Sequence, residues 1–319
     1  MRVVSAAEID AALGFPALID ALADAFRSDV VVPVRHHHAL ARGGSTATLL
    51  LMPAWSAGDG GFIGVKIVSV FPDNNVRNLP SVLGTYLLMD GASGAPLAAL
   101  DGTRLTLWRT AAASALAGRH LARRDARRMA MVGAGALAPF LIRAHLSQRP
   151  LEEIQLWNHR PEKAEHLAKI LRGEGMPVRA ARDLESAVRG ADLVSCATLS
   201  TAPLVKGAWL KAGAHLDLVG AFTLSMREAD DEALRRASIH VDTAAARSEG
   251  GDVALALKSG AISDADVKGD LFDLCRGKAA GRADTDEITV FKSVGTALED
   301  LAAATLAWRS LDHERGRAS

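Results

Sequence analysis

Six residues near the middle of the chain, Gly133-Ala134-Gly135-Ala136-Leu137-Ala138, have the spacing of a phosphate-binding turn. They follow the apolar run 128–132 and precede a helix-like segment that extends to about Ser147. Glycine at 133 permits the backbone angles of a tight turn, and glycine at 135 removes a side chain that would block a pyrophosphate. A lone turn of this form is often only structural. With a strand before it and the N-terminus of a helix after it, the turn indicates a dinucleotide-binding site.

The end of the next strand indicates which dinucleotide is preferred. Residues 153–157 (EIQLW) predict this strand, which ends in Asn158-His159-Arg160. A site for NAD usually has Asp or Glu here to bind the ribose 2′-OH, but no carboxylate occupies these positions. Asn158 and Arg160 are suited to a 2′-phosphate, so we expect NADP(H), with NAD(H) as the second option. The alternative is that Arg160 merely lies on a solvated loop.

Composition is typical of a soluble enzyme. The chain has 319 residues, and its 37 Lys and Arg balance its 37 Asp and Glu, which argues against a nucleic-acid or anionic-membrane partner. Cys196 and Cys275 fit a reducing compartment. The N-terminus carries Glu8 and Asp10 and lacks the plan of a signal peptide, and no apolar run is long enough to span a membrane. We therefore expect a cytoplasmic protein.

Two patterns follow one another along the chain. Residues 6–28 have apolar side chains at helical spacing and predict one amphipathic helix. Strands are then predicted at 48–52, 62–70, 82–89 and 97–100, with a hairpin turn at 90–94, followed by a helix at 106–121 and a charged connector at 123–128. Beyond the glycine turn, helices are predicted at 163–171, 184–189 and 228–236, and strands at 177–180, 193–197, 215–219 and 239–242. This alternation predicts an α/β fold with a Rossmann doubly wound parallel sheet. The segment 296–310 predicts a last helix that returns to the first domain.

The chain resembles the ornithine cyclodeaminase/mu-crystallin family over nearly its whole length. The segments that carry the resemblance are Leu51-Met52-Pro53-Ala54, Gly64-Val65-Lys66, Arg109-Thr110-Ala111-Ala112, Val132-Gly133-Ala134-Gly135 and Phe291-Lys292-Ser293-Val294-Gly295. The resemblance implies an α/β dimerisation and substrate domain (residues 1–120 with 296–319) and an inserted Rossmann domain (121–295). It also implies a homodimer and a small α-imino or α-amino carboxylate as the substrate.

The resemblance also assigns residues to the substrate. Arg109 matches the family's carboxylate-binding arginine, and a bidentate guanidinium grips a carboxylate well. Arg35 resembles a second arginine that faces the substrate. Lys66 lies in an apolar stretch, where a cation is costly, and matches the family's active-site lysine, which binds the carboxylate or exchanges a proton with the imine nitrogen. The alternative is that Lys66 extends to the surface at a strand edge.

Four further residues are expected to contact the cofactor. Ala197 ends the strand 193–197 and Thr198 follows it, and Ser293 and Val294 are expected at the nicotinamide end. Asp300 follows them and is expected to anchor the returning helix.

One position departs from the cyclodeaminase pattern. Family members that cyclise ornithine carry Asp where this chain has Phe222, and a phenyl ring can neither accept a proton nor orient water. The following run 224–228 (LSMRE) resembles that of mu-crystallin and the ketimine reductases.

Two other groups of residues give weaker evidence of a functional site. His36-His37-His38 are consecutive, so a strand would point them to alternate faces, and we expect no metal site. Cys196 is expected to be a small packing residue and not a nucleophile.

The sequence thus predicts an NAD(P)H-dependent reductase of cyclic ketimino acids, which converts Δ1-pyrroline-2-carboxylate to L-proline and Δ1-piperideine-2-carboxylate to L-pipecolate. The alternatives are an alanine-type amino-acid dehydrogenase, an ornithine cyclodeaminase, and a non-catalytic protein that binds NADPH and a small ligand.

Overall fold

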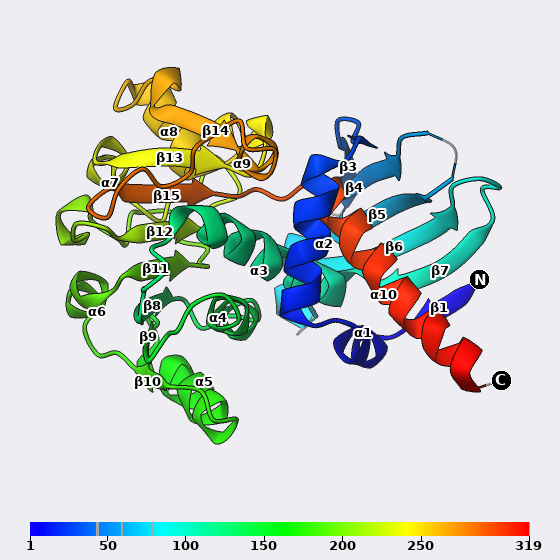
Figure 1. Ribbon diagram of the computed structural model, residues 1–319, viewed down its shortest axis with the longest axis horizontal. Helices are drawn as coiled ribbons and strands as arrows, with labels where there is room; N and C mark the ends of the chain where they lie inside the picture. Colours follow the sequence, from blue (N-terminus) through cyan, green and yellow to red (C-terminus); the bar gives the residue numbers. More distant parts are fainter. Residues whose placement is uncertain (43–44, 59, 78, 319) are drawn as a thin grey trace. The chain divides into compact units, whose positions relative to one another are not determined.

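A computed structural model describes residues 1–42, 45–58, 60–77 and 79–318 (Figure 1). The chain forms two compact units, Met1–Arg109 with Thr296–Ser319, and Thr110–Gly295. The second boundary is the one predicted at 295/296. The first falls within helix α3 (Gly102–Leu121) and not at 120/121, because this helix of small residues continues without a break from one unit into the other.

The first unit contains a mixed sheet. In the described residues its order is β1-β7-β6-β5-β4-β2, with β3 pairing β4, and every pair is antiparallel except β1 with β7. The strands are β1 (Arg2–Val4), β2 (Val30–Val31), β3 (His36–Arg42), β4 (Ser45–Ser56), β5 (Phe62–Val70), β6 (Val82–Asp90) and β7 (Pro96–Asp101). The predicted hairpin at 90–94 connects β6 to β7. A 3-10 helix, η1 (Pro72–Arg77), connects β5 to β6.

The helix predicted at 6–28 is two helices, α1 (Ala6–Ala12) and α2 (Phe15–Arg27). Gly14 lies between them in an extended conformation, and Pro16 occupies the first turn of α2, where its missing N–H does no harm. The last helix, α10 (Ala297–Ala318), packs against α2 and against strands β4 to β6, as predicted (Figure 1). This return places the first turn of α10 over the centre of the sheet.

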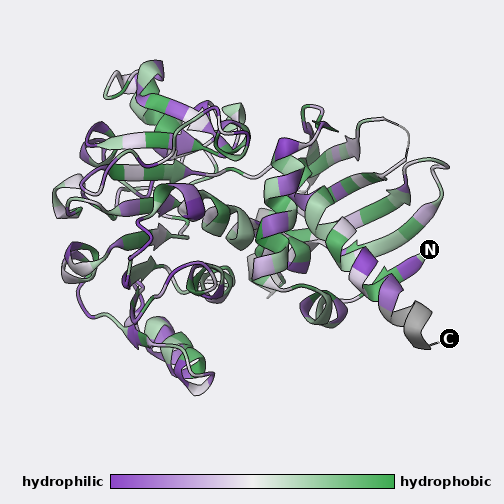
Figure 2. Ribbon diagram, viewed as in Figure 1, coloured by the Kyte–Doolittle hydropathy of each residue, from purple (hydrophilic) through white to green (hydrophobic). Residues whose placement is uncertain are grey.

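The second unit contains the predicted doubly wound parallel sheet. Its order is β10-β9-β8-β11-β12-β15-β13-β14, and all pairs between the described strands are parallel. The strands are β8 (Arg128–Val132), β9 (Glu153–Trp157), β10 (Val178–Ala180), β11 (Leu193–Cys196), β12 (His215–Leu218), β13 (Ala237–Val241), β14 (Val267–Asp270) and β15 (Ile288–Lys292). Strands β11, β12 and β15 are buried throughout, and Figure 2 shows the hydrophobic residues of this sheet. The strand order reverses between β8 and β11, which is where ligands bind in such sheets.

Helices connect the strands of this sheet. They are α4 (Ala138–Leu146), α5 (Pro161–Gly173), α6 (Leu184–Gly190), α7 (Asp231–Arg235), α8 (Gly251–Ser259) and α9 (Leu271–Cys275), with 3-10 turns η2 (Gly207–Trp209), η3 (Ala244–Arg247) and η4 (Asp264–Asp266). The helix predicted at 228–236 is wrong at its start, because Asp230 caps α7 by accepting a hydrogen bond from Ala233 N–H. Elements β14, β15, α8 and α9 were not predicted.

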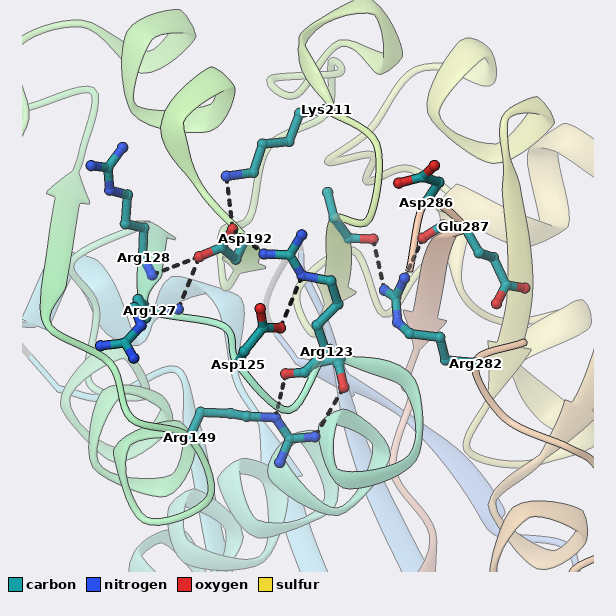
Figure 3. A network of polar contacts seen from close by, with 12 residues as sticks. Arg123, Asp125, Arg127, Arg128, Arg149, Asp192, Lys211, Arg282, Asp286 and Glu287 are labelled. Atoms are coloured by element: carbon teal, nitrogen blue, oxygen red, sulfur yellow. Dashed lines mark hydrogen bonds and ion pairs between the residues drawn. The ribbon is translucent and has the colours of Figure 1, made fainter. Parts of the chain in front are cut away.

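The charged connector before β8 is fastened at the amino ends of the strands (Figure 3). The Asp192 carboxylate accepts hydrogen bonds from the backbone N–H groups of Arg127 (2.9 Å) and Arg128 (3.0 Å), and it pairs with Arg123 (3.0 Å) and Lys211 (2.7 Å). Burial raises the pKa of Asp192, but these donors outweigh burial and hold it below its usual value. This anchor lies at the edge opposite to the glycine turn, so it orders the sheet without occupying the ligand edge.

Candidate active site

The glycine turn follows β8 directly. Gly133 has φ +110°, a conformation that side chains disfavour, and its N–H donates to the carbonyl of Trp157 at 2.8 Å. A Cβ at Gly133 would lie 2.6 Å from the carbonyl oxygen of Ala197, so the position admits only glycine without rearrangement. Gly133 thereby brings the ends of β8, β9 and β11 together.

Gly135 and Ala136 lie on the exposed side of the same turn. A Cβ at Gly135 would meet no described atom within 4 Å, so this space is one that a side chain would fill and that glycine keeps open for a ligand. Buried Ala138 then begins α4, with Pro139 in its first turn. The open turn and the helix N-terminus fit the pyrophosphate of a dinucleotide.

Asn158 is buried at the end of β9, contrary to the expectation that it faces a phosphate. Its Oδ1 accepts from Ala134 N–H at 3.3 Å, and its Nδ2 donates to the carbonyl of Arg160 at 3.0 Å. Both ends of the amide are thus used to tie the glycine turn to the end of β9. His159 and Arg160 are exposed, and Arg160 Nε donates to His159 Nε2 at 3.2 Å.

The remaining predicted cofactor residues lie at the same edge of the sheet. Ala197 N–H donates to the carbonyl of Val132 (2.9 Å), and both the N–H and the hydroxyl of Thr198 donate to Glu228 Oε1 (2.6 and 2.8 Å). Ser293 follows β15, and Val294 N–H donates to the buried carboxylate of Asp242 at 2.7 Å. The predicted cofactor residues therefore all follow the carboxyl ends of β8, β9, β11 and β15.

A buried charged network, Glu228, Asp252 and Lys292, lies at this edge and was not predicted. Lys292 Nζ donates to the carbonyl of Gly220 (2.6 Å) and pairs with Asp252 Oδ2 (3.1 Å). Asp252 Oδ1 accepts from the N–H groups of Glu228 (2.7 Å) and Ala229 (3.0 Å). The network thus connects the segments that follow β11, β12 and β13 to the last residue of β15.

Glu228 is the member of this network with the most perturbed carboxyl group. Its pKa is raised to about 7, because burial and the nearby Asp252 carboxylate outweigh the opposite effects of Lys292 and the Thr198 donors. Its Oε2 has no hydrogen-bond partner among the described residues. The sequence carried one signal of this network, because Lys292 is a cation inside the apolar segment ITVFK and a buried cation needs a partner.

The segment after β12 carries Phe222. Ala221 has φ +40°, which is unusual for a residue other than glycine, and its carbonyl accepts from Gly251 N–H at 3.0 Å. Phe222 is 47% exposed and therefore is not a core aromatic residue. No carboxylate occupies this position, as the sequence already showed.

Four charged residues meet in the first unit: Lys66 on β5, Arg109 on α3, and Glu299 and Asp300 in the first turn of α10. Lys66 Nζ lies 2.6 Å from Asp300 Oδ2. Arg109 Nη1 lies 2.6 Å from Glu299 Oε2, and Arg109 Nε lies 3.2 Å from Asp300 Oδ1. The structure therefore brings together two of the three predicted substrate residues and adds two carboxylates that were not assigned to the substrate. The expectation that Asp300 anchors the returning helix agrees with these contacts.

Lys66 is 3% exposed and does not extend to the surface. Burial lowers its pKa to about 8; Asp300 and Glu299 raise it, and Arg109 lowers it. Tyr86 lies opposite Lys66 on β6 and is fully buried. Its pKa is raised well above the usual value, mainly by burial and also by the nearby Asp300 carboxylate. A Cβ at Gly64 would lie 1.8 Å from the Tyr86 hydroxyl, so glycine is required beside this ring. The cluster is buried, and Lys66 gives up its proton more readily there than an exposed lysine would.

The remaining sequence candidates are Arg35, the three consecutive histidines and Cys196. Arg35 is half-buried in the segment before β3, and His36, His37 and His38 are exposed on that strand. Across the described ranges, no group of three or more His, Cys, Asp or Glu side chains is arranged to hold a metal ion. Cys196 is buried, and burial, followed by nearby carboxylates, raises the pKa of its thiol, which fits a packing role.

Among the described helices, none is both long and apolar enough to cross a membrane.

Comparison with known proteins agrees with this geometry. The chain is 40% identical to a Δ1-pyrroline-2-carboxylate reductase of Paracoccus denitrificans, over 87% of this chain and 90% of that one. The structure of Δ1-pyrroline-2-carboxylate reductase from Thermococcus litoralis, in complex with NADH and L-proline, superposes with a TM-score of 0.92 at 31% identity, over 98% of both chains. A dimeric archaeal alanine dehydrogenase with bound NAD superposes with a TM-score of 0.91 at 27% identity, over 99% of this chain and 97% of that one.

The family model of the ornithine cyclodeaminase/mu-crystallin family matches residues 1–314. With this match over almost the whole sequence, the chain belongs to the ornithine cyclodeaminase/mu-crystallin family.

Proposed function

We propose that the protein is an NAD(P)H-dependent reductase of cyclic ketimino acids, with Δ1-pyrroline-2-carboxylate and Δ1-piperideine-2-carboxylate as substrates. The observation that carries the proposal is the buried pair of cations, Lys66 and Arg109, in a chain that also has an open glycine turn. Such a pair suits a small carboxylate that bears a basic nitrogen. The Paracoccus and Thermococcus relatives, both named Δ1-pyrroline-2-carboxylate reductases, support the same substrate class.

The division of work follows the two units. Arg109 grips the substrate carboxylate, with Arg35 as a second contact, and Lys66 exchanges a proton with the substrate nitrogen. Because burial lowers the pKa of Lys66 to about 8, the ammonium group is a better acid than an exposed lysine. A nicotinamide cofactor, when bound, would supply the hydride for the imine carbon. The remaining contribution of the protein is to orient the reactants.

The residues of the second unit would hold the cofactor at the carboxyl edge of its sheet. Gly133, Ala134, Gly135 and Ala136 would face the pyrophosphate, and Ala197, Thr198, Ser293 and Val294 the nicotinamide end. We infer a preference for NADPH over NADH, because the exposed His159 and Arg160 offer cationic and hydrogen-bonding groups to a 2′-phosphate. Asn158 would act indirectly, through its hydrogen bond to Ala134.

Ornithine cyclodeamination is not proposed. That reaction requires the α-amino group to leave after ring closure, and Phe222 stands where cyclodeaminases carry the Asp that assists it. Imine reduction needs a hydride, a proton and a held carboxylate, none of which depends on residue 222.

We also propose that the protein acts as a cytoplasmic homodimer, with the first unit forming the dimer interface and part of the substrate site. The dimeric state named for the archaeal alanine dehydrogenase supports the assembly, and the two free cysteines support a reducing compartment.

The test is a panel of parallel assays on the purified protein. Oxidation of NADPH and NADH is followed with each cyclic imine and with pyruvate plus ammonia, and ammonia release is followed with L-ornithine and NAD⁺. We expect both cyclic imines to be reduced and ornithine to be left intact. Turnover of pyruvate with ammonia alone would indicate a linear amino-acid dehydrogenase. Cofactor binding with no turnover of any substrate would indicate a non-catalytic binding protein.

A Phe222→Asp variant tests in the same assay whether a carboxylate at this position introduces ammonia release from ornithine. If the wild-type protein releases ammonia from ornithine as fast as it reduces imines, the argument from Phe222 fails, and another residue must do the work of the missing Asp.

A further inference from the structure

Asp300 is the carboxylate shared by both cations of the first unit. One of its oxygens lies 2.6 Å from Lys66 Nζ and the other 3.2 Å from Arg109 Nε. Its neighbour Glu299 pairs with the far end of the same guanidinium, at Nη1. All four side chains are at most 8% exposed. Any anion that binds to both Lys66 and Arg109 must therefore come close to Asp300.

The formal charges of these four residues balance one another. Lys66 and Arg109 carry two positive charges, Glu299 and Asp300 carry two negative charges, and burial keeps Tyr86 neutral. A bare carboxylate held by Lys66 and Arg109 would place a second negative charge next to Asp300, which is unfavourable at a buried site even when Arg35 also binds that carboxylate. A ligand that brings its own positive charge close to its carboxylate avoids this cost.

A protonated cyclic ketimino acid has this arrangement, because its N–H⁺ is bonded to the carbon that carries the carboxylate. With the carboxylate held by Lys66 and Arg109, the N–H⁺ can face the carboxylate that lies between them. In the reduction, the iminium carbon gains a hydride from the reduced nicotinamide, and the amine nitrogen that forms gains a proton from Lys66. Lys66 then takes a proton from water.

We propose that Asp300 accepts the N–H of the protonated imine and so makes the site selective for net-neutral iminium and ammonium carboxylates over simple carboxylate anions. Asp300 is thereby a specificity-determining residue that Lys66 and Arg109 hold in place. This inference rests on the proposed function, since it concerns the substrate form that the same site takes.

The test compares two ring carboxylates that differ at the nitrogen, L-proline and cyclopentanecarboxylate. Binding is measured by calorimetry on the protein saturated with NADPH, so that neither ligand can react. Asp300→Asn removes the shared carboxylate, and Glu299→Gln is the matched control, because it makes the same charge change on the neighbouring residue. Thermal unfolding and NADPH affinity report whether each variant is folded.

We expect the wild-type protein to bind L-proline about tenfold or more tightly than cyclopentanecarboxylate, as a charge-assisted hydrogen bond would give. Asp300→Asn should lower that ratio about tenfold, whereas Glu299→Gln should keep most of it. An unchanged ratio in a folded Asp300→Asn protein would overturn the inference, as would an equal loss in both variants, which would reflect net charge alone.

Failure of the inference is distinguishable from failure of the proposed function. If the wild-type protein reduces the imine and binds L-proline but the variants show either of those contrary results, only the role of Asp300 is wrong. If the wild-type protein does neither, the proposed function is wrong.

Discussion

Replacing Arg109 with Ala removes the guanidinium that lies 2.6 Å from Glu299 and 3.2 Å from Asp300. Both carboxylates are fully buried, so they lose a partner that water cannot replace. Breaking a buried ion pair costs about 3–5 kcal/mol. The same change removes the group proposed to bind the substrate carboxylate. If transition-state binding is weakened by the same free energy, kcat/KM decreases roughly 10² to 10⁴-fold.

The fold and the chemistry can be separated with a second variant. Arg109→Ala combined with Glu299→Gln removes one cation and one anion, which leaves Lys66 paired with Asp300. Because a buried pair replaced on both sides is often neutral for stability, the double variant should recover most of the free energy of unfolding. It should not recover kcat/KM, since the grip on the substrate is still absent.

Urea unfolding, steady-state kinetics with Δ1-pyrroline-2-carboxylate and NADPH binding together decide the matter. Cofactor affinity should stay close to the wild-type value in both variants. Near-normal kcat/KM in Arg109→Ala would refute the assignment of Arg109 to the substrate. Recovery of kcat/KM together with stability in the double variant would mean that Arg109 serves the fold alone.

Four further outcomes are expected. Arg160→Asp should reverse or abolish a several-fold preference for NADPH over NADH in kcat/KM, and equal use of both cofactors by the wild-type protein would contradict the interpretation of the β9 end. The wild-type kcat/KM should fall as the pH rises above about 8, where Lys66 loses its proton. The free energy of unfolding should increase with pH between 8 and 10.5, because over that range the unfolded chain still holds the Lys66 proton that the folded chain has lost. A kcat/KM that does not change across that range would exclude Lys66 as the acid. Lys292→Met leaves Asp252 buried without its cation and should cost about 3–5 kcal/mol in urea unfolding, much of it regained on adding Asp252→Asn.

Local signals in the sequence were sufficient for strands β8 to β13 of the Rossmann sheet, but not for β14 and β15. The strand at 153–157 was predicted with the bounds that the structure has, because its apolar residues alternate and charged or polar residues flank it. The glycine turn was likewise predictable, since Gly133 is required by a backbone conformation and by the nearby carbonyl of Ala197. The break at Gly14 was missed because the helical periodicity continues across it.

Long-range contacts were beyond the reach of such signals. Glu228 has helix-like neighbours, but bonds from Thr198, thirty residues earlier, hold it outside α7. Asp300 and Glu299 meet Lys66 and Arg109 only because α10 returns across the first sheet. Asn158 was expected to face a phosphate, whereas its amide is used by the neighbouring turn. In each case the type of residue was informative, and the partner was set by the fold.

The most direct test of the proposed function follows the hydride itself. The purified protein is incubated with Δ1-pyrroline-2-carboxylate and NADPH that carries deuterium on the transferred side of nicotinamide C4, and the product is analysed by mass spectrometry and on a chiral column. The account predicts L-proline with one deuterium at the α-carbon. Unlabelled or racemic proline, or no proline at all, would contradict it.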